Sequence, residues 1–330
     1  MASIDIVIPC YNYGRFLSEA VSSVLSQGIE DLRVLIIDNA STDESADVAR
    51  ELAARDSKVQ VSLHTVNQGA TASYNEGIDW AEADYFLVLD ADDMLAPGAL
   101  RRAMNIMEKE PGIAFTHGIE LNCRHGETLP SIDNPADGRW KITPGLKYIE
   151  DTCLVPVCIV GANTVIRRTS AQKAVGYYRK TLPYSDDFEM WLRLATVGDV
   201  ASTGVIQAIR RIHTAQHSEQ FRSAQHRDFN ERERAFASFF AHEGKVLPNR
   251  ERLMRQVRVQ LGKHAYWSSV SHYYRGRKDV AAELMRFSRE RRGMAGFVPP
   301  LDWLLRMKNP VRRMKNVVRE AAARRTLPHP

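Results

Sequence analysis

Two carboxylates separated by one residue follow an apolar segment in the first third of the chain. Asp90 and Asp92 flank Ala91 directly after the run Tyr85-Phe86-Leu87-Val88-Leu89. Oxygen ligands of this kind are those that hard divalent cations such as Mg²⁺ and Mn²⁺ prefer. A cation held there would bridge a diphosphate and neutralise the charge that builds on it as it leaves. The alternative is that Asp90 and Asp93 only form a turn or cap the next helix.

Two other side chains with useful chemistry also follow apolar segments. Asp38 comes directly after the run 32–37, where a carboxylate could accept hydrogen bonds from a base or a ribose. Tyr11 follows the run 4–9, and its flat ring could stack on a base. Taken singly, Asp38 could be a turn residue and Tyr11 a surface aromatic. Their joint occurrence with the Asp90 and Asp92 pair is harder to ascribe to turns alone.

The segments that must position these side chains alternate between strand and helix patterns. Short β-branched runs predict buried strands, and apolar residues at helical spacing between them predict helices. The predicted strands are 4–9, 32–37, 59–63 and 85–89, and the predicted helices are 17–25, a helix through 48–52, 70–81 and 97–108. This alternation predicts a Rossmann-like α/β fold, a mostly parallel sheet with helices on both sides. Ligands bind beyond the carboxyl ends of such strands, so we expect the three polar segments to converge there.

Composition is that of an ordinary folded protein, with 44% hydrophobic and 26% charged residues among 330. The four cysteines form no CxxC pair, so we expect neither a disulfide framework nor a structural zinc site. No segment has the pattern of a signal peptide or approaches the roughly 20 apolar residues of a membrane span. A cytoplasmic location is therefore expected.

The positive charge of the chain lies in its C-terminal tail. Residues 301–330 hold eight of the 45 Lys and Arg residues and two of the 40 Asp and Glu residues, which gives this tail a charge of +6. The other 300 residues hold 37 basic and 38 acidic residues, a charge of −1, so the net charge of the chain is +5. From about residue 216 the pattern is helical and charged, and it ends in this basic amphipathic segment with Trp303. Such a segment could lie on an anionic membrane, or it could pack on the protein's own body or on a partner. No base-reading motif accompanies the charge, so nucleic acid is not an expected partner.

These segments together resemble the family 2 glycosyltransferases of GT-A fold. Their order, spacing and local structure match over roughly residues 3–215, and the match is most specific in the first hundred. The motifs that carry it are Ile6-Val7-Ile8-Pro9-Cys10-Tyr11-Asn12, Leu35-Ile36-Ile37-Asp38-Asn39-Ala40-Ser41-Thr42-Asp43, Asn67-Gln68-Gly69 and Leu87-Val88-Leu89-Asp90-Ala91-Asp92-Asp93.

The resemblance assigns roles at a donor site to the matching positions. Asp92 would ligate the metal, Mn²⁺ or Mg²⁺, and Asp90, next to Ala91, would face the ribose or the sugar. The remaining positions would lie around the nucleoside, most often uridine, or near the rest of the donor. These are Pro9, Tyr11, Asn12 and Asp38 for the nucleoside, and Asn67, Gly69 and Asn75 for the donor.

The second half of the resemblance supplies a general base. Asp186 and Asp187, before the helical run Phe188–Leu194, match the family's Glu-Asp segment, with Asp186 in the glutamate position and Asp187 in that of the catalytic aspartate. The alternative is that they cap the helix. His213 ends a segment resembling the family's Tyr-Arg-x-His, with Arg210 in place of tyrosine, and would be a candidate metal ligand.

The resemblance implies an inverting transfer from a nucleotide-sugar donor to an acceptor hydroxyl. Residues 1–110 would form the nucleotide-sugar-binding half, residues 111–215 the acceptor-binding half, and residues 216–330 a helical region with the basic tail. The acceptor would be a glycan or a lipid-linked molecule, in surface glycan, polysaccharide or glycolipid synthesis of bacterial type. The enzyme would be cytoplasmic or peripheral at the cytoplasmic face of a membrane.

Two other functions remain open at this point. A nucleotidyltransferase also places carboxylates beside a nucleotide, although it usually carries a glycine-rich basic loop where this chain has Pro9-Cys10-Tyr11-Asn12. A catalytically degenerate relative could serve as a nucleotide-binding scaffold. A dinucleotide-dependent oxidoreductase is disfavoured, because no GxGxxG motif follows the first strand.

Overall fold

The computed structural model describes residues 2–306 apart from 125, 129, 130, 133, 136, 158 and 214–224, together with residue 319. The chain divides into two compact units. The first comprises Met1–Ile149 and Cys158–Thr214, and the second comprises Glu150–Val157 and Ala215–Pro330.

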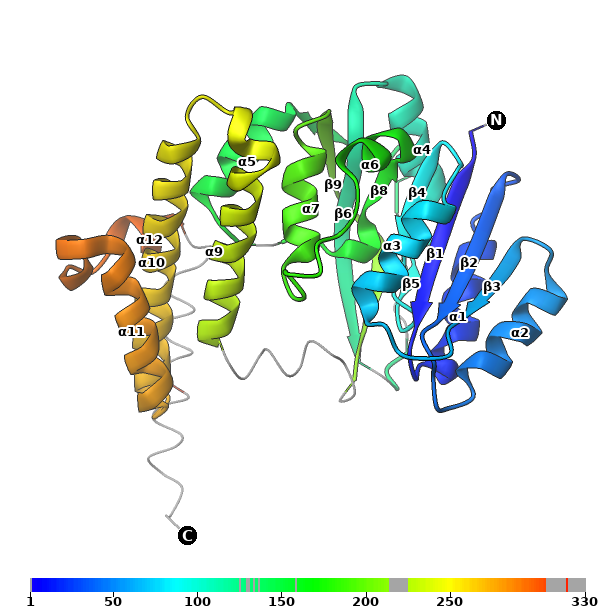
Figure 1. The fold of residues 1–330 in the computed structure, drawn as a ribbon, viewed down its shortest axis with the longest axis horizontal. Coiled ribbons are helices and arrows are strands. Elements are labelled where there is room, and N and C mark those ends of the chain that lie inside the picture. The colour runs from blue at the N-terminus through cyan, green and yellow to red at the C-terminus, as the bar shows by residue number, and fades with distance from the viewer. Residues whose placement is uncertain are drawn as a thin grey trace, which may run out of the picture. The chain divides into compact units, whose positions relative to one another are not determined.

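The first part of the chain builds four parallel strands joined by helices (Figure 1). The strands are β1 (Ile4–Cys10), β2 (Leu32–Asp38), β3 (Val59–Leu63) and β4 (Tyr85–Val88), and the helices are α1 (Gly14–Leu25), α2 (Ser45–Arg55), α3 (Ala70–Trp80) and α4 (Ala99–Lys109). Each predicted strand agrees with the observed one to within a residue. The prediction of an α/β fold with a mostly parallel sheet is confirmed.

The remaining strands extend the same sheet to nine strands in the order β3-β2-β1-β4-β8-β6-β9-β5, with β7 paired to β9. They are β5 (Met94–Leu95), β6 (Ile113–Arg124), β7 (Lys141–Thr143), β8 (Ile166–Arg168) and β9 (Asp199–Ile212), and the helical segments here are α5 (Gly145–Leu154), η1 (Ala162–Thr164), α6 (Thr169–Val175) and α7 (Asp186–Leu194). The sheet is mixed, because β8 runs antiparallel to both β4 and β6.

The sheet is covered by helices on both faces, which explains why β1 is apolar apart from Asp5, whose buried carboxylate pairs with Arg33 at 2.7 Å. Ile4, Ile6 and Ile8 lie in a core cluster shared with α1 and α4. Val7 points to the opposite face, where a Cβ added to Gly77 of α3 would lie only 2.6 Å from its side chain. A strand buried on both faces has no polar alternation, and the close approach of α3 depends on the absence of a side chain at Gly77.

The strand order creates a switch point between β1 and β4. From β1 the chain builds outward to β2 and β3, and it then returns to place β4 on the other side of β1. In open α/β sheets a crevice for ligands forms at the carboxyl ends of the strands that flank such a point. The segments that follow β1 and β4 are residues 11–13 and 89–93, so a ligand-binding site is expected between these two segments.

Several helix boundaries differ from the sequence expectation, and two of the differences have local reasons. The helix predicted over 97–108 begins at Ala99, because Gly98 takes a left-handed conformation (φ 71°) that lies outside a helix. The helix predicted to include Phe188–Leu194 starts earlier, at Asp186, with Ser185 at its N-cap. Both acidic residues of the pair at 186 and 187 therefore lie in the first turn of α7, where negative charge is favoured.

The second unit is helical in the part that the structure describes. Its elements are α9 (Gln225–Ala241), η2 (Glu243–Val246), α10 (Arg250–Tyr274), α11 (Lys278–Arg292), η3 (Gly293–Phe297) and α12 (Leu301–Arg306). The helices α10 and α11 pack side by side (Figure 1), and Phe229, Phe236, Leu261 and Leu284 are fully buried in this unit. None of the described helices combines the length and apolar character of a membrane span. Most of the basic tail lies outside the described residues, so its membrane contact stays a prediction.

Candidate nucleotide and metal site

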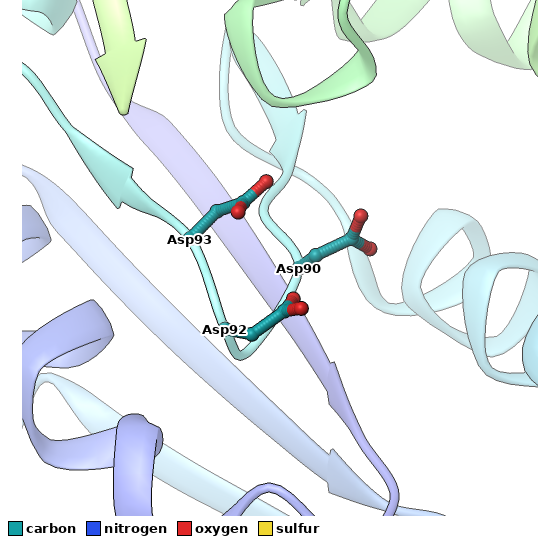
Figure 2. A group of neighbouring side chains, drawn as sticks. All are labelled: Asp90, Asp92 and Asp93. Carbon is teal, nitrogen blue, oxygen red and sulfur yellow. The ribbon is translucent and has the colours of Figure 1, made fainter. Parts of the chain in front are cut away.

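Three carboxylates gather on the turn between β4 and β5 (Figure 2). The side chains are those of Asp90, Asp92 and Asp93, and their ligand oxygens lie within 4.8 Å of one another. Asp92 and Asp93 are buried and Asp90 is half-buried. A group of anionic oxygens this close together offers the donor set that Mg²⁺ and Mn²⁺ prefer.

Asp93 anchors this turn to the rest of the sheet. Its Oδ2 accepts a hydrogen bond of 2.6 Å from Nδ2 of Asn163 in η1, and its Oδ1 accepts one of 3.1 Å from the backbone N–H of Arg211 in β9. Its own N–H donates to the carbonyl of Asp90 at 3.0 Å. Both carboxylate oxygens thus have donors in the protein, so Asp93 fixes the geometry of the turn on which Asp90 and Asp92 lie.

His213 joins the acidic cluster from the end of β9. Its Nε2 lies 3.0 Å from Oδ2 of Asp92, and its ring packs against Tyr13 and Phe16 with centroids 5.5 Å and 4.9 Å away. The Nδ1 atom of His213 is buried and has no hydrogen-bond partner within the described residues. Carboxylate oxygens suit Mg²⁺ and Mn²⁺, and imidazole nitrogen is a ligand of divalent transition metals, so the residues present fit a divalent cation.

Electrostatic repulsion within the cluster is strong. Burial, together with the charges of Asp92 and Asp187, raises the pKa of Asp90 from 3.8 to about 7. Burial and the charges of Asp92 and Asp90 also raise the pKa of Asp93 well above its ordinary value. Like charges in a buried site disfavour their own ionisation. A bound cation would reverse this balance, since it attracts the ionised forms.

Asp38 offers an unsatisfied acceptor at the end of β2. Its Oδ2 accepts a hydrogen bond from the N–H of Ser41 at 3.1 Å, whereas its Oδ1 is buried without a hydrogen-bond partner in the described part of the chain. Buried acceptors are nearly always paired in folded proteins, and a ligand N–H or O–H would satisfy this one. After the neighbouring strand β1, Pro9 is half-buried and Tyr11 is exposed (44%).

Asn12 ties the two loops after β1 and β2 together. Its backbone takes a left-handed conformation (φ 60°), and its N–H donates to the hydroxyl of Ser41 at 2.9 Å. Its Oδ1 accepts from the N–H of Thr42 at 2.7 Å. Asn12 therefore holds the loops that carry Tyr11 and Asp38, and Asn is among the residues that adopt this conformation most readily.

The segment 67–69 joins the loop after β2 through side-chain amides. Oδ1 of Asn67 accepts from Nδ2 of Asn39 at 3.1 Å and from the N–H of Gly69 at 2.8 Å. Asn75, in the second turn of α3, has a different set of contacts. Its amide donates to the carbonyl of Tyr178 at 3.1 Å and accepts from the N–H of the same residue at 2.8 Å.

Asp186 and Asp187 approach the same edge from α7. The hydroxyl of Thr71 in α3 lies 3.5 Å from Oδ2 of Asp186. The charge of Asp187 acts on Asp90, and burial with the charge of Asp186 raises the pKa of Asp187 itself to about 7. Burial also raises the pKa of Asp186 to about 6. A buried carboxyl with a pKa near 7 is suited to take up a proton at neutral pH.

A buried arginine and a tyrosine support Asp187. Nη1 of Arg167 donates to the Tyr178 hydroxyl at 2.8 Å, which leaves the hydroxyl proton for a second partner. The charge of Arg167 and a hydrogen bond from Tyr178 lower the pKa of Asp187 against the effect of burial. Tyr74 also belongs to this group, because burial and then the charges of Asp90, Asp187 and Asp186 raise the pKa of its hydroxyl.

The residues expected from the sequence thus lie at the ends of β1, β2, β4 and β9, in the segment before α3 and its second turn, and in the first turn of α7. Sequence reasoning missed Tyr74, Asn163, Arg167 and Tyr178. No motif marks them. Asn163, Arg167 and Tyr178 reach the site through long-range contacts from other parts of the fold, whereas Tyr74 directly precedes the expected Asn75 in α3. Asp93 was part of a recognised motif, but only the structure gives it an anchoring contact to β9.

The mixed sheet with helices on both faces is a GT-A fold. S. aureus TarS in complex with UDP has a similar fold, with a TM-score of 0.58 at 14% identity over 99% of this chain and 93% of that chain. A mannosyltransferase from Pyrobaculum calidifontis, in complex with GDP-Man and Mn²⁺, has a TM-score of 0.58 at 14% identity over 98% of this chain and 86% of that chain. At such identity the likeness establishes the fold.

The sequence comparison gives the family. The model described as glycosyl transferase family 2 matches residues 5–174, so the chain belongs to this family, and the resemblance seen in the sequence is confirmed. An uncharacterized glycosyltransferase of Haemophilus influenzae is 32% identical over 37% of this chain and 49% of its own length. A second one from the same organism is 24% identical over 67% of this chain and 69% of its own length. The chain thus spans about half the length of the first relative.

Proposed function

We propose that this protein is an inverting glycosyltransferase that moves a sugar from a nucleoside-diphosphate sugar to an acceptor hydroxyl. One observation carries the proposal. The acidic cluster at residues 90–93, with His213 beside Asp92, lies at the same edge of the sheet as Asp38, whose Oδ1 lacks a partner within the described residues. A cation site and a base-binding acceptor at one sheet edge are what a nucleoside diphosphate requires.

The donor would lie across the ends of β1, β2 and β4. Asp38 would accept a hydrogen bond from the base, and Tyr11, with Pro9 beneath the loop, would offer its exposed ring for stacking. Asn12 would hold these loops in place. Residues 67–69 and Asn75 would border the donor from the side of α3.

Asp92 and His213 would hold the divalent cation, and Asp90, with Ala91 behind it, would face the ribose or the sugar. When bound, Mn²⁺ or Mg²⁺ would supply a positive charge that stabilises the diphosphate as it leaves. Asp93 keeps the turn in place through β9, so the positions of Asp90 and Asp92 are preorganised before the donor arrives.

Asp187 would be the general base. Burial and Asp186 raise its pKa to about 7, so near neutral pH it can accept the proton of an acceptor hydroxyl as the sugar carbon is attacked. A single in-line displacement of this kind inverts the configuration of the sugar carbon. Asp187 lies in the first turn of α7, a rigid element, which keeps its carboxylate in one position.

The solved structures of similar fold support a nucleotide-sugar donor and a metal. They contain UDP, UDP-GlcNAc, or GDP-Man with Mn²⁺. We therefore propose uridine as the base, with guanosine as the first alternative. The acceptor would be a glycan or a lipid-linked molecule on the cytoplasmic side of a membrane, and we propose residues 111–215 as the acceptor-binding half. A nucleotidyltransferase and a nucleotide-binding scaffold are the competing functions.

The test is a thermal-shift panel of UDP, GDP, TDP and their sugars, with and without Mn²⁺, on the wild type and Asp92→Ala. A ligand that binds only the folded state raises the melting temperature, by an amount that grows with its concentration over Kd. We expect one diphosphate to stabilise the wild type with Mn²⁺ and to lose this effect in Asp92→Ala. No shift with any nucleotide would contradict the proposal. Release of pyrophosphate from a nucleoside triphosphate would favour the nucleotidyltransferase.

A further inference from the structure

A histidine that no recognised motif contains lies beneath the segment 67–69. His64 follows β3, and its side chain is only 8% exposed. Its Nδ1 lies 3.0 Å from Oδ1 of Asn39, and its Nε2 lies 2.6 Å from Oε2 of Glu76 in α3. The ring therefore bridges the loop after β2 and the helix that follows the segment 67–69.

A neighbouring backbone N–H shows which atom is the donor and which the acceptor in the hydrogen bond between His64 and Asn39. Oδ1 of Asn39 already accepts from the backbone N–H of Gln68 at 2.8 Å, so it is an oxygen and an acceptor. Nδ1 of His64 must then carry a proton and donate it to Asn39. On the other side of the ring, Nε2 and Oε2 of Glu76 are 2.6 Å apart, so a proton must lie between these two atoms. The other carboxylate oxygen of Glu76 accepts from the hydroxyl of Ser62 at 2.5 Å.

Asn39 links His64 to the segment 67–69 through its side-chain amide. With its oxygen fixed by His64 and Gln68, its Nδ2 faces Oδ1 of Asn67 at 3.1 Å. That oxygen also accepts the N–H of Gly69 at 2.8 Å, and Gly69 takes a left-handed conformation (φ 84°) directly before α3. The pair φ 84° and ψ 158° is essentially restricted to glycine. Because glycine can also adopt many other conformations, the side-chain amides are what select this one.

We propose that His64 is a positioning residue of the donor site: its Nδ1–H orients Asn39 and thereby fixes the segment 67–69 that borders the nucleotide sugar. This inference rests on the proposed function, because that function places the donor beside residues 67–69. His64 acts through Asn39 and touches no substrate. Glu76 holds the ring at the angle that this contact needs.

Two substitutions separate the two ring nitrogens. In His64→Asn the amide nitrogen replaces Nδ1, so the contact to Asn39 is kept and that to Glu76 is lost. In His64→Gln the amide nitrogen replaces Nε2, so the contact to Glu76 is kept and that to Asn39 is lost. Because each variant loses one contact of the same buried ring, a merely structural role would affect both alike. His242→Gln, at an exposed histidine of the second unit, controls for the substitution itself.

The first measurement needs no nucleotide. Amide hydrogen exchange reports local opening of a segment, and we expect the N–H groups of Gln68 and Gly69 to exchange at least tenfold faster in His64→Gln than in the wild type. In His64→Asn they should exchange within about threefold of the wild-type rate. Equal rates in the two variants would overturn the inference, and so would a ¹⁵N spectrum showing His64 Nδ1 without a proton.

The second measurement uses UDP and GDP with Mn²⁺. For the diphosphate that binds the wild type, His64→Gln should weaken binding roughly tenfold, as the loss of one buried hydrogen bond would, whereas His64→Asn should bind nearly as the wild type does. The donor KM should rise in His64→Gln while kcat changes little. Equal affinity in the two variants would overturn the inference. If the wild type binds neither diphosphate, the proposed function fails, and the exchange rates alone decide whether His64 positions the loop.

Discussion

The imidazole Nε2 of His213 lies 3.0 Å from the carboxylate Oδ2 of Asp92, although 121 positions separate the two residues in the chain. The short strand β5 explains how they meet. Met94 and Leu95 pair antiparallel with Ile209 and Ala208 of β9, so the turn before β5 runs alongside the last residues of β9. The two-residue strand therefore assembles the candidate metal site from the two halves of the sheet.

The pairing of Asp92 with His213 predicts the order of metal affinities. Asp92→Asn removes an anionic oxygen, so we expect Mn²⁺ to bind at least about a hundredfold more weakly. His213→Asn should weaken binding about tenfold to a hundredfold, since ligands and their direct partners typically contribute that much. Calorimetric titration of Mn²⁺ in the presence of the bound diphosphate measures both. The exposed Asp47→Asn serves as the control, and unchanged affinity in Asp92→Asn would remove the metal assignment.

The pKa of Asp187 predicts how turnover depends on pH. A general base must be ionised, and burial with Asp186 raises this pKa to about 7, so kcat/KM should rise with pH and level off above about 7. Asp187→Asn should retain nucleotide binding while turnover falls by about a hundredfold to ten-thousandfold. Near-normal turnover of Asp187→Asn would exclude it as the base.

Tyr178→Phe tests the support of that base. The hydrogen bond from Tyr178 lowers the pKa of Asp187, so its loss should move the rise in kcat/KM to higher pH. The neighbouring Tyr177→Phe is a matched control, because the Tyr177 hydroxyl is bonded to Asp79 at the surface, and its profile should match the wild type. A profile that moves equally in both variants would show that Tyr178 has no specific effect on the base.

The strands and candidate site residues of the first hundred residues were readily predicted, because neighbouring residues in the sequence determine them. The strands β1, β2 and β4 are mostly apolar and buried. Asp38 ends β2, and Asp90 and Asp92 come directly after the apolar run 85–89 that contains β4. A turn at the carboxyl end of a parallel strand lies at the ligand-binding edge in any such sheet. Residue type, order and fold class were therefore sufficient there.

The rest of the site depends on contacts that no local pattern encodes. The strand β8 has only three residues, two of them arginines, so it lacks an apolar pattern. Its Arg167 is nevertheless fully buried, because it lies against Phe86, Tyr178 and Trp191 and donates to the Tyr178 hydroxyl. Buried arginine is rare without such partners, and those partners are far from it in sequence or in another element.

Burial of Asp186 and Asp187, with repulsion between neighbouring carboxylates, predicts that the metal-free protein loses stability as pH rises. The pKa values of Asp186 and Asp187 are raised from 3.8 to about 6 and about 7, so between about pH 4 and pH 7 the folded state binds more protons than the unfolded state. Stability then falls with rising pH across this window. Urea unfolding in EDTA should give a smaller free energy of unfolding at pH 8 than at pH 5.

Asp187→Asn isolates the contribution of one carboxyl to this slope. The variant cannot ionise at that position, so its free energy of unfolding should decline less between pH 5 and pH 8 than that of the wild type. Mn²⁺ with the bound diphosphate should offset the decline in the wild type, since it binds the ionised cluster. If Asp187→Asn leaves the pH dependence of the free energy of unfolding unchanged, the pKa of this carboxyl is not raised in the folded state.

A buried ion-pair network supports the segment that carries Tyr178, and it predicts the largest loss of stability. Glu189 of α7 is fully buried between Arg179 and Arg193, with Nε of Arg193 at 2.9 Å. Arg193 also donates to the carbonyls of Val175 and Tyr177, each at 2.7 Å. Removing one charge from a buried network leaves the others unpaired, so Glu189→Gln should lower the free energy of unfolding by about 3–5 kcal/mol.

Glu51→Gln is the matched control for this charge removal. Glu51 pairs with Arg55 at 3.0 Å on the exposed surface of α2, and exposed pairs contribute at most about 1 kcal/mol. Urea unfolding at pH 7 compares the two variants under one condition. If Glu189→Gln loses no more than Glu51→Gln, the network does not hold α7, and the positions of Tyr178 and Asp187 must depend on the bonds of Asn75 to the Tyr178 backbone instead.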